Sequence, residues 1–94
     1  MQNNYTYTQR VALQKVKQAI NEIGLFTGEF EAGEAINKAL TAITTEWPTI
    51  SEMARQVKWL SPAEKKVVKI HGLLQLLQEG QAPKNTITGL KNLL

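Results

Sequence analysis

Residues 61–80 decide the fold, and their sequence reads SPAEKKVVKIHGLLQLLQEG. The stretch opens with three signals of a helix start. Ser61 suits the cap, Pro62 suits the first helical position, and Glu64 is placed to reach back to the cap. Apolar side chains then recur at helical spacing: Val67, Ile70, Leu74 and Leu77. We therefore predict a long amphipathic helix that begins at Ser61, ends just before Gly80 and turns one apolar side toward a core.

The preceding segment, residues 49–60, predicts a shorter helix. Thr49 and Glu52 have the spacing of a second capping box, so we expect a helix from Ser51 to about Trp59. Three of its side chains are expected to face the core: Met53, Val57 and Leu60. The two segments would form a helix pair joined by a very tight corner.

Two helices are expected before this pair. The first covers residues 6–23 or 8–23, with a capping box formed by Thr6 and Gln9. Its apolar stripe consists of Leu13, Val16, Ile20 and Ile23, flanked by Ala12 and Ala19. The second covers residues 30–47, and the proline that follows stops it.

A loop after Gly80 leads to a last short helix, for which Asn85 is the expected cap. This helix carries four apolar side chains: Ile87, Leu90, Leu93 and Leu94. Phe26, at the corner between the first two helices, is expected to fold back on the core. Because no run alternates as a half-buried strand would, the sequence predicts an all-α fold. We expect one domain over residues 1–94, a compact bundle of about five helices with a helix-turn-helix-like third and fourth pair.

Composition narrows the class of protein. The chain has 94 residues, of which 43% are hydrophobic and 20% charged, and it has no cysteine. A small domain without disulfides relies on packing, as is usual in the reducing cytosol. No apolar run approaches the roughly 18 residues of a membrane-spanning helix, and the polar N-terminus lacks the apolar stretch of a signal peptide. We therefore expect a cytoplasmic protein without a membrane span.

Catalytic and metal-binding chemistry find little support in the sequence. Aspartate and cysteine are absent, and His71 is the only histidine. No second histidine or cysteine stands at ligand spacing, and no glycine-rich loop is placed to cradle a phosphate. We expect a partly buried structural histidine, no metal, no cofactor and no enzymatic activity.

Charge is unevenly distributed along the chain. Residues 1–47 carry four Lys or Arg against five Glu, whereas residues 48–94 carry seven against three. Between Arg55 and Lys69 alone there are five cations and one carboxylate. Such asymmetry favours an anionic partner for the second half of the chain.

The helix pair resembles the middle of helix-turn-helix and winged-helix DNA-binding domains, and the resemblance covers residues 35–80, about half of the chain. In such domains the opening residues of the second helix enter the major groove. The resemblance implies a small regulator of bacterial or phage type that binds duplex DNA, and a homodimer would suit two half-sites. The candidate nucleic-acid contacts are Arg55, Lys58, Ser61, Lys65, Lys66 and Lys69.

A second interpretation stays open, because charged outer faces are ordinary on amphipathic helices. The chain would then be a helical module for one specific protein partner: an immunity protein, a phage inhibitor or a small subunit of a nucleoprotein complex. The candidate partner contacts are Trp59, Leu90 and Leu93. Trp59 either anchors a partner or covers the corner between the third and fourth helices. The last apolar segment either docks on the bundle or pairs with a second subunit.

Overall fold

The structure is a computed structural model that describes residues 5–25, 29–80 and 83–94. Over these residues the chain forms five α-helices and no strand: α1 (Tyr7–Leu25), α2 (Glu29–Glu46), α3 (Ile50–Arg55), α4 (Pro62–Gln78) and α5 (Pro83–Leu93). A 3₁₀-helical turn, η1 (Val57–Trp59), lies between α3 and α4. The predicted all-α fold is confirmed, whereas the prediction for Phe26 lies outside the described residues.

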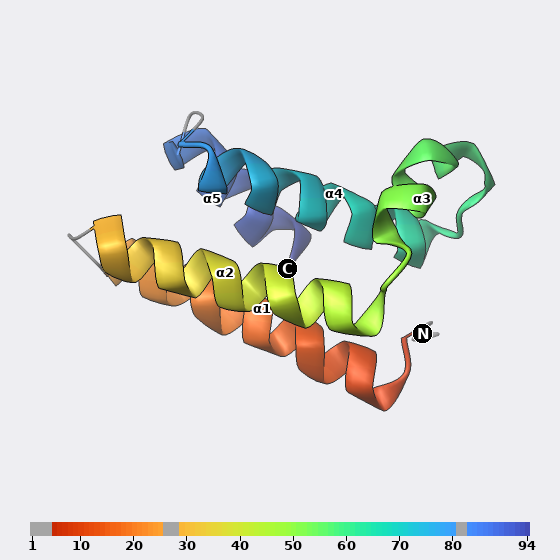
Figure 1. Ribbon diagram of the computed structural model, residues 1–94, viewed down its shortest axis with the longest axis horizontal. Helices are drawn as coiled ribbons and strands as arrows, with labels where there is room; N and C mark the ends of the chain where they lie inside the picture. Colours follow the sequence, from red (N-terminus) through yellow and green to blue (C-terminus); the bar gives the residue numbers. More distant parts are fainter. Residues whose placement is uncertain (1–4, 26–28, 81–82) are drawn as a thin grey trace.

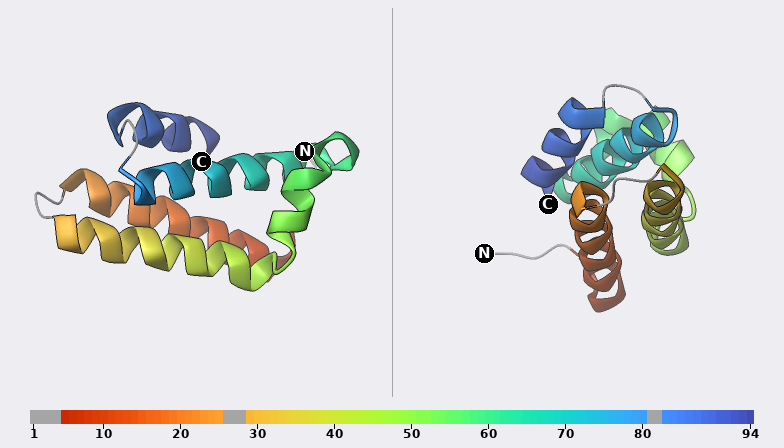
Figure 2. Two further views of the ribbon diagram at one scale, coloured as in Figure 1. Left: turned by 45° about the horizontal axis from the view of Figure 1, so that its top comes forward. Right: turned by 90° about the vertical axis from the view of Figure 1, so that its left-hand side faces the viewer.

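The helices pack as a hairpin covered by two further helices. α1 and α2 run antiparallel and make the most extensive contact between any two helices of the described chain (Figure 1). α4 packs against this hairpin mainly through α2, and α5 folds back beside α4 and over α1 (Figure 2). α3 and η1 project at the end where α4 begins, as Figure 1 shows. No helix within the described ranges is long and apolar enough to cross a bilayer.

The core confirms the predicted stripe of the long helix. Four apolar side chains of α4 are buried: Val67, Ile70, Leu74 and Leu77. Buried apolar side chains of all five helices belong to the same cluster, together with Trp47 in the α2–α3 connection. On α1 the stripe is also buried except for Leu13, which is half-buried against the cluster. The helical period of the sequence therefore located most of the core.

Two of the predicted capping boxes are confirmed. At the start of α4, the Ser61 hydroxyl accepts a hydrogen bond from the Glu64 N–H at 3.2 Å. The Glu64 carboxylate accepts one from the Ser61 N–H at 3.2 Å in return. Before α1, Gln9 N–H donates to the Thr6 hydroxyl at 3.2 Å, and Thr6 N–H donates to the Gln9 side chain at 3.0 Å.

Tyr5, which precedes α1, connects the beginning of α4 to the end of α2. The Tyr5 hydroxyl donates a hydrogen bond to the Ala63 carbonyl at 2.9 Å. The Tyr5 ring also meets the Trp47 ring edge-on, with 6.1 Å between the ring centroids. The first turn of α4 is thus held by its own cap and by a residue that precedes α1.

The prediction for the third helix is wrong in two respects. Thr49 makes no side-chain cap hydrogen bond, so the second capping box is absent. The α-helix ends at Arg55, and Gln56 leaves helical geometry with φ −120° and ψ 33°. Val57 therefore no longer follows Met53 on one helical face, and it is 40% exposed instead of turned to the core.

The start of the last helix also differs from the prediction. α5 begins at Pro83, so Asn85 lies within its first turn and is not its cap. Proline is well suited to the first helical position, because its fixed φ is helical and its missing N–H would have no partner there. The preference of proline for that position decided the boundary.

The two caps give a matched test. We expect Ser61→Ala to lower the free energy of unfolding by about 1 kcal/mol, because it removes the acceptor of the Glu64 N–H. Thr49→Ala, at a cap without a side-chain hydrogen bond, is expected to change it by less than about 0.5 kcal/mol. Urea unfolding followed by circular dichroism measures both, and equal losses would contradict the assignment of the caps.

Candidate functional site

The lysines predicted to contact nucleic acid lie exposed on the N-terminal half of α4. Lys65, Lys66 and Lys69 are all exposed, and none forms an ion pair with a described carboxylate. The ion pair found in the described chain joins Arg55 to Glu52, with 3.6 Å between Nη1 and Oε1. Both of its side chains are largely exposed, so it contributes little to stability and leaves Arg55 accessible.

The three lysines of α4 do not share one direction. With 3.6 residues per turn, Lys65 and Lys69 lie one turn apart on the side away from the buried Val67. Lys66 lies on the flank of the helix, one turn before Ile70, and lines a cleft toward α1. The three lysines were predicted as one group of contacts. In the structure, Lys65 and Lys69 form an outer pair and Lys66 lies to the side of it.

The corner before α4 exposes a tryptophan. Trp59 is 83% exposed, so it does not cover the junction between α3 and α4. Lys58 beside it is exposed as well, whereas Ser61 is half-buried. The Ser61 hydroxyl is engaged in the cap, where it accepts from the Glu64 N–H and lies 3.0 Å from the Glu64 carboxylate oxygen.

The two leucines of α5 that were predicted as partner contacts, Leu90 and Leu93, both pack against the core of the chain. Leu90 is 0% exposed and belongs to the core cluster. Leu93 is partly buried and packs against the same cluster. The apolar side of α5 is thus used within the chain, because α5 docks on α4 and α1.

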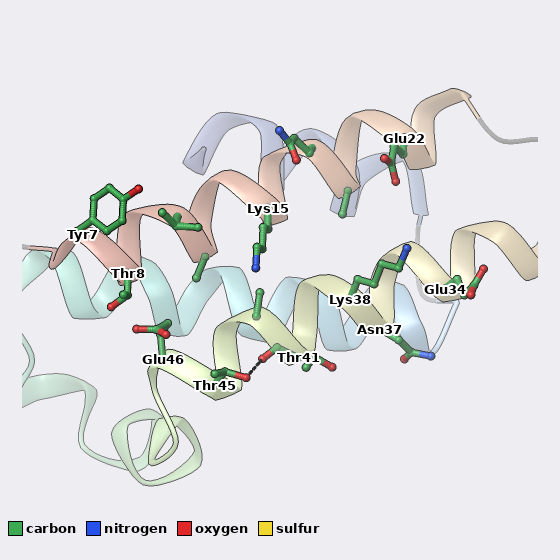
Figure 3. A pocket seen from close by; sticks show the side chains of 15 residues that line it. Tyr7, Thr8, Lys15, Glu22, Glu34, Asn37, Lys38, Thr41, Thr45 and Glu46 are labelled. Carbon is green, nitrogen blue, oxygen red and sulfur yellow. Dashed lines mark hydrogen bonds between the residues drawn. The ribbon is translucent and has the colours of Figure 1, made fainter.

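A groove of about 900 Å³ runs between α1 and α2 on their outer side. Lys15 and Lys38 reach over its middle, as Figure 3 shows. Glutamates lie toward its ends: Glu22 and Glu34 at one end, and Glu46 at the other (Figure 3). Small side chains line its floor: Ala12, Ala19 and Ala42. This groove could not be predicted from the sequence, because it arises from the pairing of two helices.

A smaller cleft of about 280 Å³ opens between α1, α4 and α5. Arg10 and Lys17 of α1 line it together with Lys66 of α4. Arg10 and Lys17 were not among the predicted contacts, because the glutamates of α2 outweigh the cations in the net charge of residues 1–47. Their spacing of two helical turns, which puts both on one face of α1, is the signal that could have identified them.

His71 is a buried side chain of α4 at 9% exposure. Burial lowers the pKa of His71 below its ordinary value, because loss of water disfavours the charged imidazolium. No group of three or more His, Cys, Asp or Glu side chains that could hold a metal ion occurs in the part of the chain that the structure describes. The position is that of a neutral histidine in the packed interior.

Comparison of the chain with protein-family models, curated proteins and solved structures found no match.

Acidification is expected to destabilise the fold through His71. The unfolded histidine titrates near pH 6.5 and the folded one at a lower pH, so the unfolded chain binds the proton more readily. The stability contribution is complete above about pH 6.5 and is lost as the pH falls through 6.5 toward the folded pKa. Urea unfolding at pH 7.5, 6.5 and 5.5 measures it, with His71→Met as the comparison. A wild-type dependence equal to that of the variant would contradict this assignment.

Proposed function

We propose that the protein is a small, non-enzymatic, cytoplasmic DNA-binding protein, a regulator of bacterial or phage type. α4 would contact duplex DNA with the outer side of its N-terminal half. The observation that carries the proposal is the exposure of Lys65 and Lys69 on this side, without a carboxylate partner among the described residues. Two copies on two half-sites would be a natural binding form, because paired half-sites raise affinity and specificity together.

The surroundings of the two lysines support the proposal. α5 lies beside the C-terminal part of α4 and leaves the end of the molecule that carries η1 open (Figures 1 and 2). Glu64 is the carboxylate nearest in sequence, and it is turned back into the cap of its own helix. Repulsion between Glu64 and a DNA phosphate is thereby reduced. Arg55 and Lys58, on the preceding α3 and η1, add two exposed cations at the same end.

The proposal rests on the exposed cations and not on the shape of the corner. Between α3 and α4 the chain passes through η1 and an extended Leu60, with φ −85° and ψ 150°. Phosphate contacts position a protein on duplex DNA, whereas base contacts specify the sequence. Exposed cations at the end of a helix can reach phosphates whatever the geometry of the preceding corner.

Charge reversal on α4 tests this proposal. We expect the triple variant Lys65→Glu, Lys66→Glu, Lys69→Glu to abolish binding to a random 20-base-pair duplex, because it places repulsion where the phosphates would lie. For the wild type, five neutralised phosphates would give a slope of log affinity against log salt of about −4 to −5. Fluorescence anisotropy at several salt concentrations measures both quantities.

The matched control reverses three exposed lysines elsewhere: Lys15 and Lys38 in the α1–α2 groove, and Lys84 at the start of α5. Circular dichroism verifies that both triple variants remain folded. Absence of duplex binding by the wild type, or equal binding by the two variants, would refute the proposal.

A second candidate function is the binding of one specific protein, and the exposure of Trp59 favours it. Val57 in the same turn is also exposed, so η1 presents two apolar side chains to the solvent. Exposed tryptophans that become buried at an interface are frequent hot spots of binding energy.

Trp59→Ser separates the two functions. Because Trp59 is exposed, the substitution is expected to change the free energy of unfolding by less than about 0.5 kcal/mol. If η1 anchors a protein, a purified partner should bind the variant weaker by about 2 kcal/mol or more. Calorimetric titration measures that loss, and duplex affinity measured in parallel should change far less. Unchanged partner affinity would exclude Trp59 as the anchor.

A further inference from the structure

Folding brings cations from distant parts of the sequence to one cleft. Arg10 and Lys17 on α1 and Lys66 on α4 line the same cleft of about 280 Å³. Its other lining side chains are neutral: Leu13, Gln14, Ile70, Leu93 and Leu94. No glutamate side chain is among the described residues that line it. The cleft therefore combines three cationic side chains with a largely apolar floor.

The cations of α1 lie in a line along the helix and do not surround a compact binding site. Arg10 and Lys17 are two helical turns apart on one face, a rise of about 10 Å. Gln14 lies between them on the same face, and all three side chains are exposed. Successive phosphates of one strand of duplex DNA rise by about 3.4 Å along the helix axis and lie farther apart than that because the strand winds around the axis, so a line of this length matches about two phosphates. Arg, Lys and Gln are all common phosphate contacts.

Lys66 connects this line to the outer side of α4. It lines the cleft with its own side chain, and it follows Lys65 directly and precedes Lys69 by one turn. The cationic surface thus continues from the outer side of α4, around its flank, to α1. The opposite side of α1 is different, because the groove there carries Glu22, Glu34 and Glu46 as well as its two lysines.

We propose that this cleft holds the phosphodiester backbone of bound DNA, and that Arg10 and Lys17 contribute phosphate contacts in addition to those of α4. The inference rests on the proposed function and extends it to a second helix. Continuity with the lysines of α4 favours a polymer over a small anion, because one strand could engage both helices. The arginine, with its planar fork of donors, would form the bidentate phosphate contact.

The test compares two double variants of equal charge. Arg10→Gln with Lys17→Gln removes two cations from the cleft, and Lys15→Gln with Lys38→Gln removes two from the opposite groove. All four side chains are exposed, and none forms an ion pair with a described residue, so both variants should keep the fold. Affinity for a 20-base-pair duplex is measured by anisotropy at 50 to 200 mM salt. The α4 triple variant is measured beside them, together with an α4 double variant, Lys65→Glu with Lys69→Glu, that leaves Lys66 in the cleft.

We expect the cleft variant to bind more weakly and to have a salt slope shallower by about 2, because each of the two missing cations would leave one phosphate with its counterion. The groove variant should keep nearly the wild-type slope. The inference is overturned if the cleft and groove variants lose the same amount of affinity, or if both keep the wild-type affinity. In either case the cleft is not a phosphate site. The proposed function then still stands wherever the α4 triple variant abolishes binding.

The remaining outcomes also separate the two proposals. A shallower slope in the cleft variant but not in the α4 double variant, which leaves Lys66 in place, would support the cleft and overturn the role of the outer side of α4. Absence of duplex binding by the wild type at 50 mM salt would overturn both. Binding of inorganic pyrophosphate by such a wild-type protein, abolished in the cleft variant, would assign the cleft to a small anion.

Discussion

Burial of α4 between the α1–α2 hairpin and α5 is the constraint on which the rest of the structure depends. Val67, Ile70 and Leu74 are each fully buried, and a side chain of this size contributes about 1.5–3 kcal/mol when it is removed from water. Because one broad side of α4 is used for packing, only a narrow outer strip is left for contacts with other molecules. Lys65 and Lys69 occupy that strip. The position of the candidate interface is therefore a consequence of the core.

Local and tertiary interactions agree at the beginning of α4, and this explains why the sequence predicted α4 so well. Ser61, Pro62 and Glu64 form the cap that their order predicts. The Tyr5 hydroxyl, from a distant part of the chain, also donates a hydrogen bond to the carbonyl of Ala63 in the same turn. Where such agreement is missing, prediction was less successful. The spacing of Thr49 and Glu52 predicted a capping box that the structure lacks. α3 has only 6 residues, and helices that short depend on packing more than on local propensity.

The two clefts could not be predicted, because each arises when helices meet. The sequence places Arg10 and Lys17 on one face of α1, but it contains no sign that Lys66 will line the same space. The net charge of residues 1–47 also conceals a difference between the first two helices. α1 carries three cations and one glutamate, whereas α2 carries four glutamates and one lysine. The basic character of α1 is therefore present in the sequence, although the net charge of the first half does not reveal it.

This difference between α1 and α2 gives the molecule an electrostatic polarity that the total charge of +3 does not express. The basic face of α1 borders α4 and α5, whereas its other face joins α2 in a groove where glutamates stand beside lysines. Since fields from like charges add and those from opposite charges cancel, a polyanion would be attracted to the first face more strongly than to the second. In the proposed complex, a strand that follows α4 onto α1 would leave the groove uncovered.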